Sequence, residues 1–160
     1  MKLHFMSKLI ILLITLMSVS SWAQKSDHII YDSFGDWSVR HVFDRETLEF
    51  RYSDAKTPLL MSDGRIVEFQ INRRGSDNRT TYILHGWWDK VIIRIGQKEF
   101  AQAQSGLHTF YGAADPELLD AIANASEPIE IEKFDGDISY KGTISPKGSS
   151  AALRWIRVVK

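Results

Sequence analysis

Three residues in the second half of the chain are of the types that hydrolases use for nucleophilic attack: Ser105, His108 and Asp115. In such an enzyme the imidazole takes the proton of the serine hydroxyl, and the carboxylate holds the imidazole in place. The Gly-x-Ser-x-Gly turn that exposes the nucleophile of α/β-hydrolases surrounds neither Ser105 nor any other serine. The Ser-Gly-Leu-His stretch is more simply explained as a turn. We therefore expect no catalytic residue and no enzymatic activity.

Two glutamates, Glu130 and Glu132, have the spacing that places both carboxylates on one face of a strand. A pair of carboxylates is what most glycoside hydrolases require. The alternation of these glutamates with Ile129 and Ile131 instead predicts that they face solvent, where charged side chains are ordinarily found. We expect no part in catalysis for either of them.

Potential metal ligands are few and poorly spaced. Asp135 and Asp137 flank Gly136, but a calcium loop needs more alternating carboxylates and a distal bidentate glutamate. A type I′ hairpin turn explains the same residues. The histidines at positions 28, 41, 85 and 108 form no His-x-x-x-His or Glu-x-x-His pair. We expect neither a metal site nor a cofactor.

Trp87 and Trp88 are the strongest candidates for contact with a partner. Successive side chains of an extended chain point to opposite sides, so at most one of the two can be simple core. An exposed tryptophan near His85 could stack on a sugar ring, a peptide side chain or a lipid interface. The alternative is that both rings close the end of the fold, because tryptophan is largely buried on average.

Arg73, Arg74 and Arg79 form a local basic cluster with Asp77 inside it. Such a cluster could attract an acidic partner, for example the phosphates of lipid A or a cell-wall polymer. The alternative is an ordinary solvated loop. The chain as a whole has 20 basic and 20 acidic residues, without the basic excess that nucleic acid binding requires, so we expect no nucleic acid partner.

The first 23 residues have the pattern of a secretory signal peptide. Lys2 and Lys8 precede an apolar run at residues 9–17, and Ser21 and Ala23 are small residues at the positions a signal peptidase recognises. The apolar run is too short to span a membrane comfortably. We expect cleavage after Ala23, a periplasmic or secreted protein of a Gram-negative bacterium, and no stable membrane span after cleavage.

Residues 24–160 are expected to form one domain rich in β-structure. The chain has no cysteine, so the hydrophobic core alone must stabilise an exported fold. Alternating apolar residues predict a buried central hairpin of Thr80–His85 and Lys90–Ile95, joined by residues 86–89. Residues 24–33 are predicted to be a polar lead-in. Further strands are predicted at residues 37–43, 48–52, 65–72, 99–104, 107–111, 129–134 and 138–144, with a separate apolar patch at 59–61.

Two helices interrupt this pattern. Asp115, Pro116 and a glutamate at position 117 are a strong helix start, and Pro128 prevents continuation past about residue 126. Ser149 and Ser150 are suited to cap a short C-terminal helix. The predicted fold is mainly β: an antiparallel β-sandwich or partly open barrel with one inserted helix and a short C-terminal helix.

Four segments of the chain are similar to the invasion-associated locus B (IalB-like) family of exported bacterial proteins. They are FGDWSV at residues 34–39, VIIRIGQKEF at 91–100, ELLDAIANA at 117–125 and KGTISPKGSSAALRWI at 141–156. Members of this family typically carry cysteines, one of them soon after the first tryptophan, and this chain has none. The resemblance implies an exported envelope protein that is associated with host interaction.

These observations favour a non-enzymatic exported protein that binds an envelope or host protein or glycan. We expect the partner to contact Trp87, Trp88, His85, Arg73, Arg74 and Arg79. The alternative function is inhibition of a host or rival hydrolase such as lysozyme, by insertion of one loop into the cleft of that enzyme.

Overall fold

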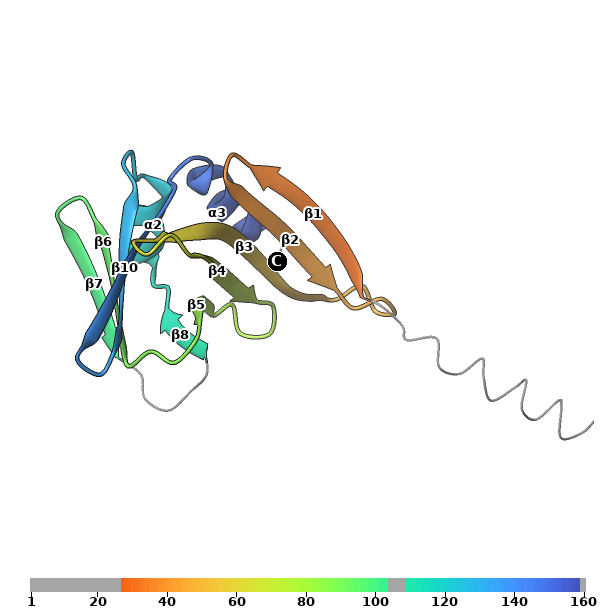
Figure 1. The fold of residues 1–160 in the computed structure, drawn as a ribbon. Coiled ribbons are helices and arrows are strands. Elements are labelled where there is room, and N and C mark those ends of the chain that lie inside the picture. The colour runs from red at the N-terminus through yellow and green to blue at the C-terminus, as the bar shows by residue number, and fades with distance from the viewer. Residues whose placement is uncertain (1–26, 104–108, 159–160) are drawn as a thin grey trace, which may run out of the picture.

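One antiparallel sheet organises the chain, as seen in a computed structural model that describes residues 27–103 and 109–158 (Figure 1). Its strands are β1 (His28–Phe34), β2 (Trp37–Phe43), β3 (Phe50–Met61), β4 (Ile66–Arg74), β5 (Thr80–His85), β6 (Lys90–Ile95), β7 (Lys98–Ala103), β8 (Thr109–Ala113), β9 (Ile129–Asp135) and β10 (Ile138–Ile144). Two helices, α2 (Pro116–Ala123) and α3 (Ser149–Val158), complete the described part.

The sheet is nearly closed into a barrel. Neighbouring strands follow the order β7-β6-β9-β10-β3-β4-β5-β8, and the β1–β2 hairpin extends from β3 as an arm. The end strands β7 and β8 are bridged by the carboxamide of Gln102, which donates to the carbonyl of Ala113 and accepts from its N–H, both at 2.7 Å. In the described residues no helix is long and apolar enough to cross a membrane.

Alternate residues of the strands fill the barrel interior. Phe69, Tyr82 and Phe110 form a stack of aromatic rings, with centroids 6.0 and 5.8 Å apart. Gly112 allows this stack to form, because a Cβ at that position would lie only 1.9 Å from Cζ of Tyr82. The remaining interior is aliphatic, including Leu59, Ile71, Leu84, Val91, Ile93, Ile129, Ile131 and Ile144.

The helices pack on each other and on the arm. Asp115 caps α2 by accepting the N–H of Leu118 at 2.8 Å, as the sequence predicts. The Ser149 hydroxyl at the start of α3 donates to the carbonyl of Ile122 in α2 at 2.9 Å. The apolar side of α3, with Leu153 buried, lies against β1, β2 and β3 (Figure 1).

The predicted fold class is confirmed in the form of the partly open barrel, but one predicted pairing is wrong. Thr80–His85 and Lys90–Ile95 are strands with the predicted bounds, yet they do not form a hairpin. β5 pairs with β4 and β8, whereas β6 pairs with β7 and β9. Asp89 explains the difference. Its N–H donates to the carbonyl of Phe134, and its carboxylate accepts from the N–H of Gly136. These bonds attach the start of β6 to the β9–β10 hairpin.

Two smaller predictions are also wrong. The expected polar lead-in contains the strand β1, which pairs with β2 over its whole length. The expected strand at residues 48–52 and the apolar patch at 59–61 belong to one strand, β3. Proline is tolerated within β3 because Pro58 lies where the strand changes neighbours: its pairing with β2 ends at Lys56, and its pairing with β10 begins at Leu59.

Candidate functional site

The residues predicted to contact a partner fall into two separate groups. His85, Trp87 and Trp88 lie at the end of β5, whereas Arg73, Arg74 and Arg79 lie at the turn before it. A strand of this length separates its ends by roughly 17 Å, at about 3.4 Å per residue. The structure therefore does not bring the tryptophans and the arginines into one site.

Trp88 is half-buried and packs against the hydrophobic core. Its indole N–H donates to the carbonyl of His85 at 2.9 Å, and its ring meets the edge of Tyr140 at a centroid distance of 5.6 Å. The ammonium of Lys133 lies 4.2 Å from its ring centre. Trp87, in contrast, is 52% exposed, so of the two tryptophans it is the one placed for contact with a partner.

Lys133 is a buried base that the sequence analysis did not single out. Its side chain is only 2% exposed, and burial, together with the nearby Arg65, lowers its pKa to about 8. A signal for it was present in the sequence: Lys133 continues the alternation of Ile129 and Ile131 and therefore faces the same interior. The ammonium of Lys133 contacts the ring of Trp88, and the carboxylate of Asp63 offsets part of the lowering of its pKa.

Arg73 is a structural residue. Its guanidinium donates to the carbonyl of Ile156 in the last turn of α3 at 3.1 Å and to the side chain of Asn78 at 2.7 Å. It also lies over the ring of Phe50, 5.7 Å from the centroid. A cation at a helix C-terminus stabilises the partial negative charge of the exposed carbonyls. Arg73 therefore ties α3 to the sheet and is turned away from the other two arginines of the cluster.

Arg74 and Arg79 line a groove on the outer face of the sheet. The register explains the grouping: Arg74 is opposite Tyr52, and Ile83 is opposite Tyr111. Side chains opposite each other in a strand pair lie on the same face. The groove has a volume of about 460 Å³ and is lined by Arg51, Tyr52, Asn72, Arg74, Ser76, Arg79, Thr81, Ile83 and Tyr111.

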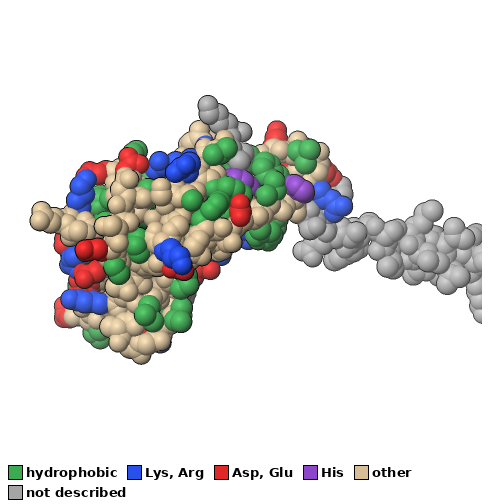
Figure 2. All heavy atoms as spheres, turned by 90° about the horizontal axis from the view of Figure 1, so that it is seen from above, with side chains coloured by type: hydrophobic (Ala, Val, Ile, Leu, Met, Phe, Trp, Pro, Cys, Tyr) green, Lys and Arg blue, Asp and Glu red, His purple; other side chains and the backbone are tan. Residues whose placement is uncertain are grey.

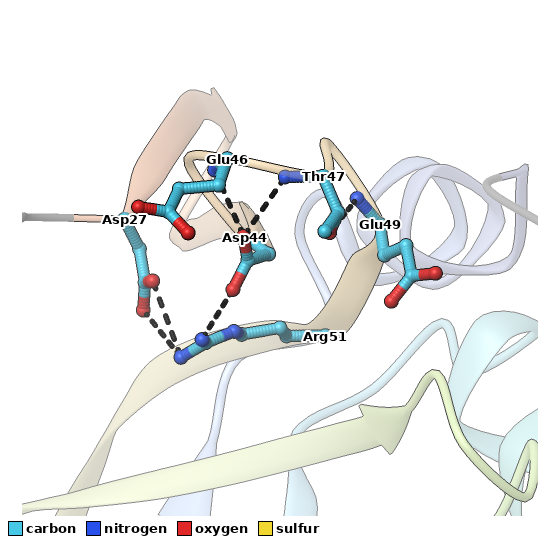
Figure 3. Close-up of polar contacts among 6 residues, drawn as sticks. All are labelled: Asp27, Asp44, Glu46, Thr47, Glu49 and Arg51. Atoms are coloured by element: carbon cyan, nitrogen blue, oxygen red, sulfur yellow. Dashed lines mark hydrogen bonds and ion pairs between the residues drawn. The ribbon is translucent and has the colours of Figure 1, made fainter.

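The third arginine of the groove, Arg51, is already neutralised. Figure 3 shows its guanidinium between Asp44, at 2.6 Å, and Asp27, at 3.2 Å. Asp44 also accepts the backbone N–H groups of Glu46 and Thr47, and these bonds together with Arg51 hold the pKa of its carboxyl well below the usual range. Arg51 therefore fixes the β2–β3 turn next to the groove.

Arg74 and Arg79 differ from Arg51 in their partners. Among the residues that the structure describes, neither guanidinium forms an ion pair, and both side chains are exposed. The backbones of the two residues are joined by a hydrogen bond from Arg74 N–H to the Arg79 carbonyl at 3.0 Å, which closes the turn. Two uncompensated cations are thus held on a common turn at the rim of the groove.

Two other surface grooves contain charges that are paired with each other. One of about 560 Å³ beside the β1–β2 turn contains Lys56 and Glu68, which pair with each other at 2.9 Å. Another of about 290 Å³ contains Glu132, whose carboxylate is held by Arg94 at 2.7 Å. That contact lowers the pKa of Glu132. Glu132 is only 8% exposed, so the prediction that it faces solvent is wrong, whereas Glu130 is exposed as predicted. Glu132 is ionised and paired, which does not suit a general acid.

Where the remaining candidates lie in the described residues, they form no catalytic arrangement. Asp115 is engaged as the cap of α2, and Ser105 and His108 lie outside the described residues. His41 is buried, and its Nδ1 shares a hydrogen bond with the Ser53 hydroxyl. Its ring stacks on that of Trp155, with the ring centroids 3.5 Å apart. In the described part of the chain no group of three or more histidine or acidic residues could hold a metal ion.

Comparison with known proteins adds no relative: no family model, no curated protein and no solved structure matches this chain.

Proposed function

We propose that this chain is a non-enzymatic, exported binding domain that holds an anionic group of an envelope or host macromolecule in the groove beside Arg74 and Arg79. The observation that supports it is a pair of exposed guanidinium groups that form no ion pair with any residue the structure describes, next to a groove whose other arginine is neutralised. A phosphate or carboxylate would supply the missing negative charge, since the guanidinium fork matches the geometry of both anions.

The rest of the groove is suited to the body of such a ligand. Asn72, Ser76 and Thr81 offer amide and hydroxyl groups, and Tyr52 and Tyr111 offer aromatic rings on the same face. Rings next to hydrogen-bonding groups are typical of sites that bind sugars or polar peptides. We therefore favour a glycan or protein segment that carries phosphate or carboxylate groups over a purely apolar partner.

The proposed location is the periplasm or the exterior of a Gram-negative cell, from the signal-peptide pattern of the first 23 residues. The resemblance to IalB-like proteins supports that location and a role in host interaction.

The test is a titration of the segment 24–160 with a hexose phosphate and with a hexuronate, followed by capture from envelope extract. We expect Arg74→Ala/Arg79→Ala to lose binding in both experiments while its unfolding curve stays unchanged. The matched control is Arg45→Ala/Arg154→Ala, which removes the same charge from exposed positions outside the groove. Equal binding by the two double variants would refute the groove as the site.

Inhibition of a hydrolase is the alternative function from the sequence analysis, and it has its own assay. Lysozyme activity is measured with an excess of the purified protein, and an unchanged rate dismisses inhibition of lysozyme. A reduced rate that survives in Arg74→Ala/Arg79→Ala but not in Trp87→Ala would assign that function to the exposed tryptophan.

A further inference from the structure

The β1–β2 arm ends in a strand, β1, with one edge that pairs with no other described strand. In the described residues β1 pairs only with β2, and it forms the outer rim of the arm (Figure 1). Hydrophobic and histidine side chains gather along this arm in the view from above (Figure 2). Edge strands of native proteins are commonly protected by lysine, proline or a bulge. The seven residues of β1 include no lysine or proline, and their register with β2 is regular.

The turn of the hairpin determines which backbone groups of β1 point outward. Phe34 pairs with Trp37 across a two-residue turn whose first residue, Gly35, has φ of 58°. Such a turn closes on a hydrogen-bonded pair, and in an antiparallel ladder hydrogen-bonded and non-hydrogen-bonded positions alternate. The groups of Ile29, Tyr31 and Ser33 therefore point away from β2.

One of these three positions is already occupied. The N–H of Ser33 donates to the carboxylate of Asp32 at 2.7 Å. The open part of the edge thus centres on Ile30, between Ile29 and Tyr31. The side chains of Ile30 and Tyr31 are 45% and 68% exposed.

We propose that two copies of this chain associate through β1, in an antiparallel register centred on Ile30. In this register Ile29 of one copy is opposite Tyr31 of the other, and the two residues exchange their free backbone hydrogen bonds. His28 of each copy then lies opposite Asp32 of the other, which places a base against an acid at both ends of the pairing. A two-fold axis requires this kind of self-complementarity.

The charge pattern favours a second copy over an unrelated strand. Histidine and aspartate lie two positions before and two positions after Ile30, so the same segment supplies both halves of each pair. Aromatic–aliphatic and oppositely charged pairs directly across strands stabilise a sheet. This association is independent of the proposed anion binding, because the groove residues lie on β3, β4, β5 and β8 and the turns beside them, and none on β1. A dimer would present two grooves.

The chain has no cysteine, so a single introduced thiol reports the register. At a non-hydrogen-bonded antiparallel position the two Cα atoms lie about 4.5 Å apart, within the range that a disulfide spans. We expect Ile30→Cys in the segment 24–160 to form a covalent dimer rapidly under mild oxidation. The control is Ile138→Cys, which is 58% exposed on β10. Equal rates of dimer formation for the two variants would overturn the proposal.

A charge-pairing experiment tests the same contact without a covalent bond. Sedimentation of Ile30→Lys alone and of Ile30→Glu alone should show monomers, because like charges face each other across the two-fold axis. An equimolar mixture should recover the dimer that the unsubstituted protein forms at high concentration. A monomeric unsubstituted protein at all concentrations, or a mixture that stays monomeric while the unsubstituted protein dimerises, would refute this register.

Discussion

The ammonium of Lys133 lies 4.2 Å from the ring centre of Trp88, at the end of the barrel and away from solvent. The contact is a cation–π interaction in a desolvated position, which is the setting where such contacts are strongest. Desolvation nevertheless lowers the pKa of Lys133 to about 8, so at neutral pH the buried charged form reduces the free energy of unfolding.

The first prediction is that Lys133→Met stabilises the protein at neutral pH, by about 2 kcal/mol, because an apolar side chain of similar length avoids the desolvation of the ammonium. Between pH 8 and the ordinary lysine pKa near 10.5 the unfolded chain binds more protons at this position than the folded chain. The stability of the unsubstituted protein should therefore rise in that range relative to the variant. Denaturant unfolding at pH 7 and pH 9.5 measures the difference.

The control for this prediction is Lys90→Met. Lys90 also lies over an aromatic ring, that of Phe134 at 5.4 Å, but its side chain is exposed. Its removal should change the free energy of unfolding by less than about 1 kcal/mol at either pH. A loss of stability in Lys133→Met would show that the contact with Trp88 outweighs the desolvation.

The second prediction separates the two tryptophans. Trp88→Ala should lower the free energy of unfolding by about 2 kcal/mol, because it removes the contacts of this half-buried ring with Tyr140 and Lys133. Trp87→Ala should have a much smaller effect, since that side chain is mostly exposed. Thermal unfolding of the two variants checks this. Equal destabilisation would contradict the packing of Trp88 against the core and the exposure of Trp87.

Much of the secondary structure followed from local patterns. The strands β2, β5, β6 and β10 have the predicted bounds, and Asp115 caps α2 as predicted, because alternation and capping depend on neighbouring residues. Pairing was harder, since β6 joins β9, which lies far along the chain. Sequence proximity suggested a hairpin where Asp89 instead binds the β9–β10 turn.

The candidate site was only partly predictable for the same reason. The cluster of Arg73, Arg74 and Arg79 was visible in the sequence, but strand alternation within the folded sheet turns Arg73 toward α3 and leaves Arg74 on the outer face. Tyr52 and Tyr111 join the groove through the pairing of β3, β4, β5 and β8. No local pattern connects residues that far apart.

The third prediction concerns acid stability. Burial, and secondarily the nearby Arg73, lower the pKa of His41 from 6.5 to about 4. As pH falls from about 6.5 to 4 the unfolded chain takes up a proton that the folded chain does not, so the fold loses up to about 3 kcal/mol from this group over that range. His41→Gln should have a shallower dependence of unfolding free energy on pH in this window. His85→Gln, at an exposed position, should keep the original slope.

The last prediction concerns the seam of the barrel. The side chain of Gln102 takes the place of a strand neighbour for Ala113, with one hydrogen bond in each direction at 2.7 Å. Gln102→Leu keeps a similar volume but leaves both backbone groups of Ala113 without this partner. Because the two hydrogen bonds are exposed and water can replace Gln102, the change should cost only about 1 kcal/mol. Amide hydrogen exchange should become faster in β8, with the N–H of Ala113 affected most, while β3 and β4 stay protected. Gln97→Leu in the β6–β7 turn is the control and should leave exchange in β8 unchanged. Unchanged protection of Ala113 in Gln102→Leu would mean that the seam is closed by the packing of β7 and β8 and not by this side chain.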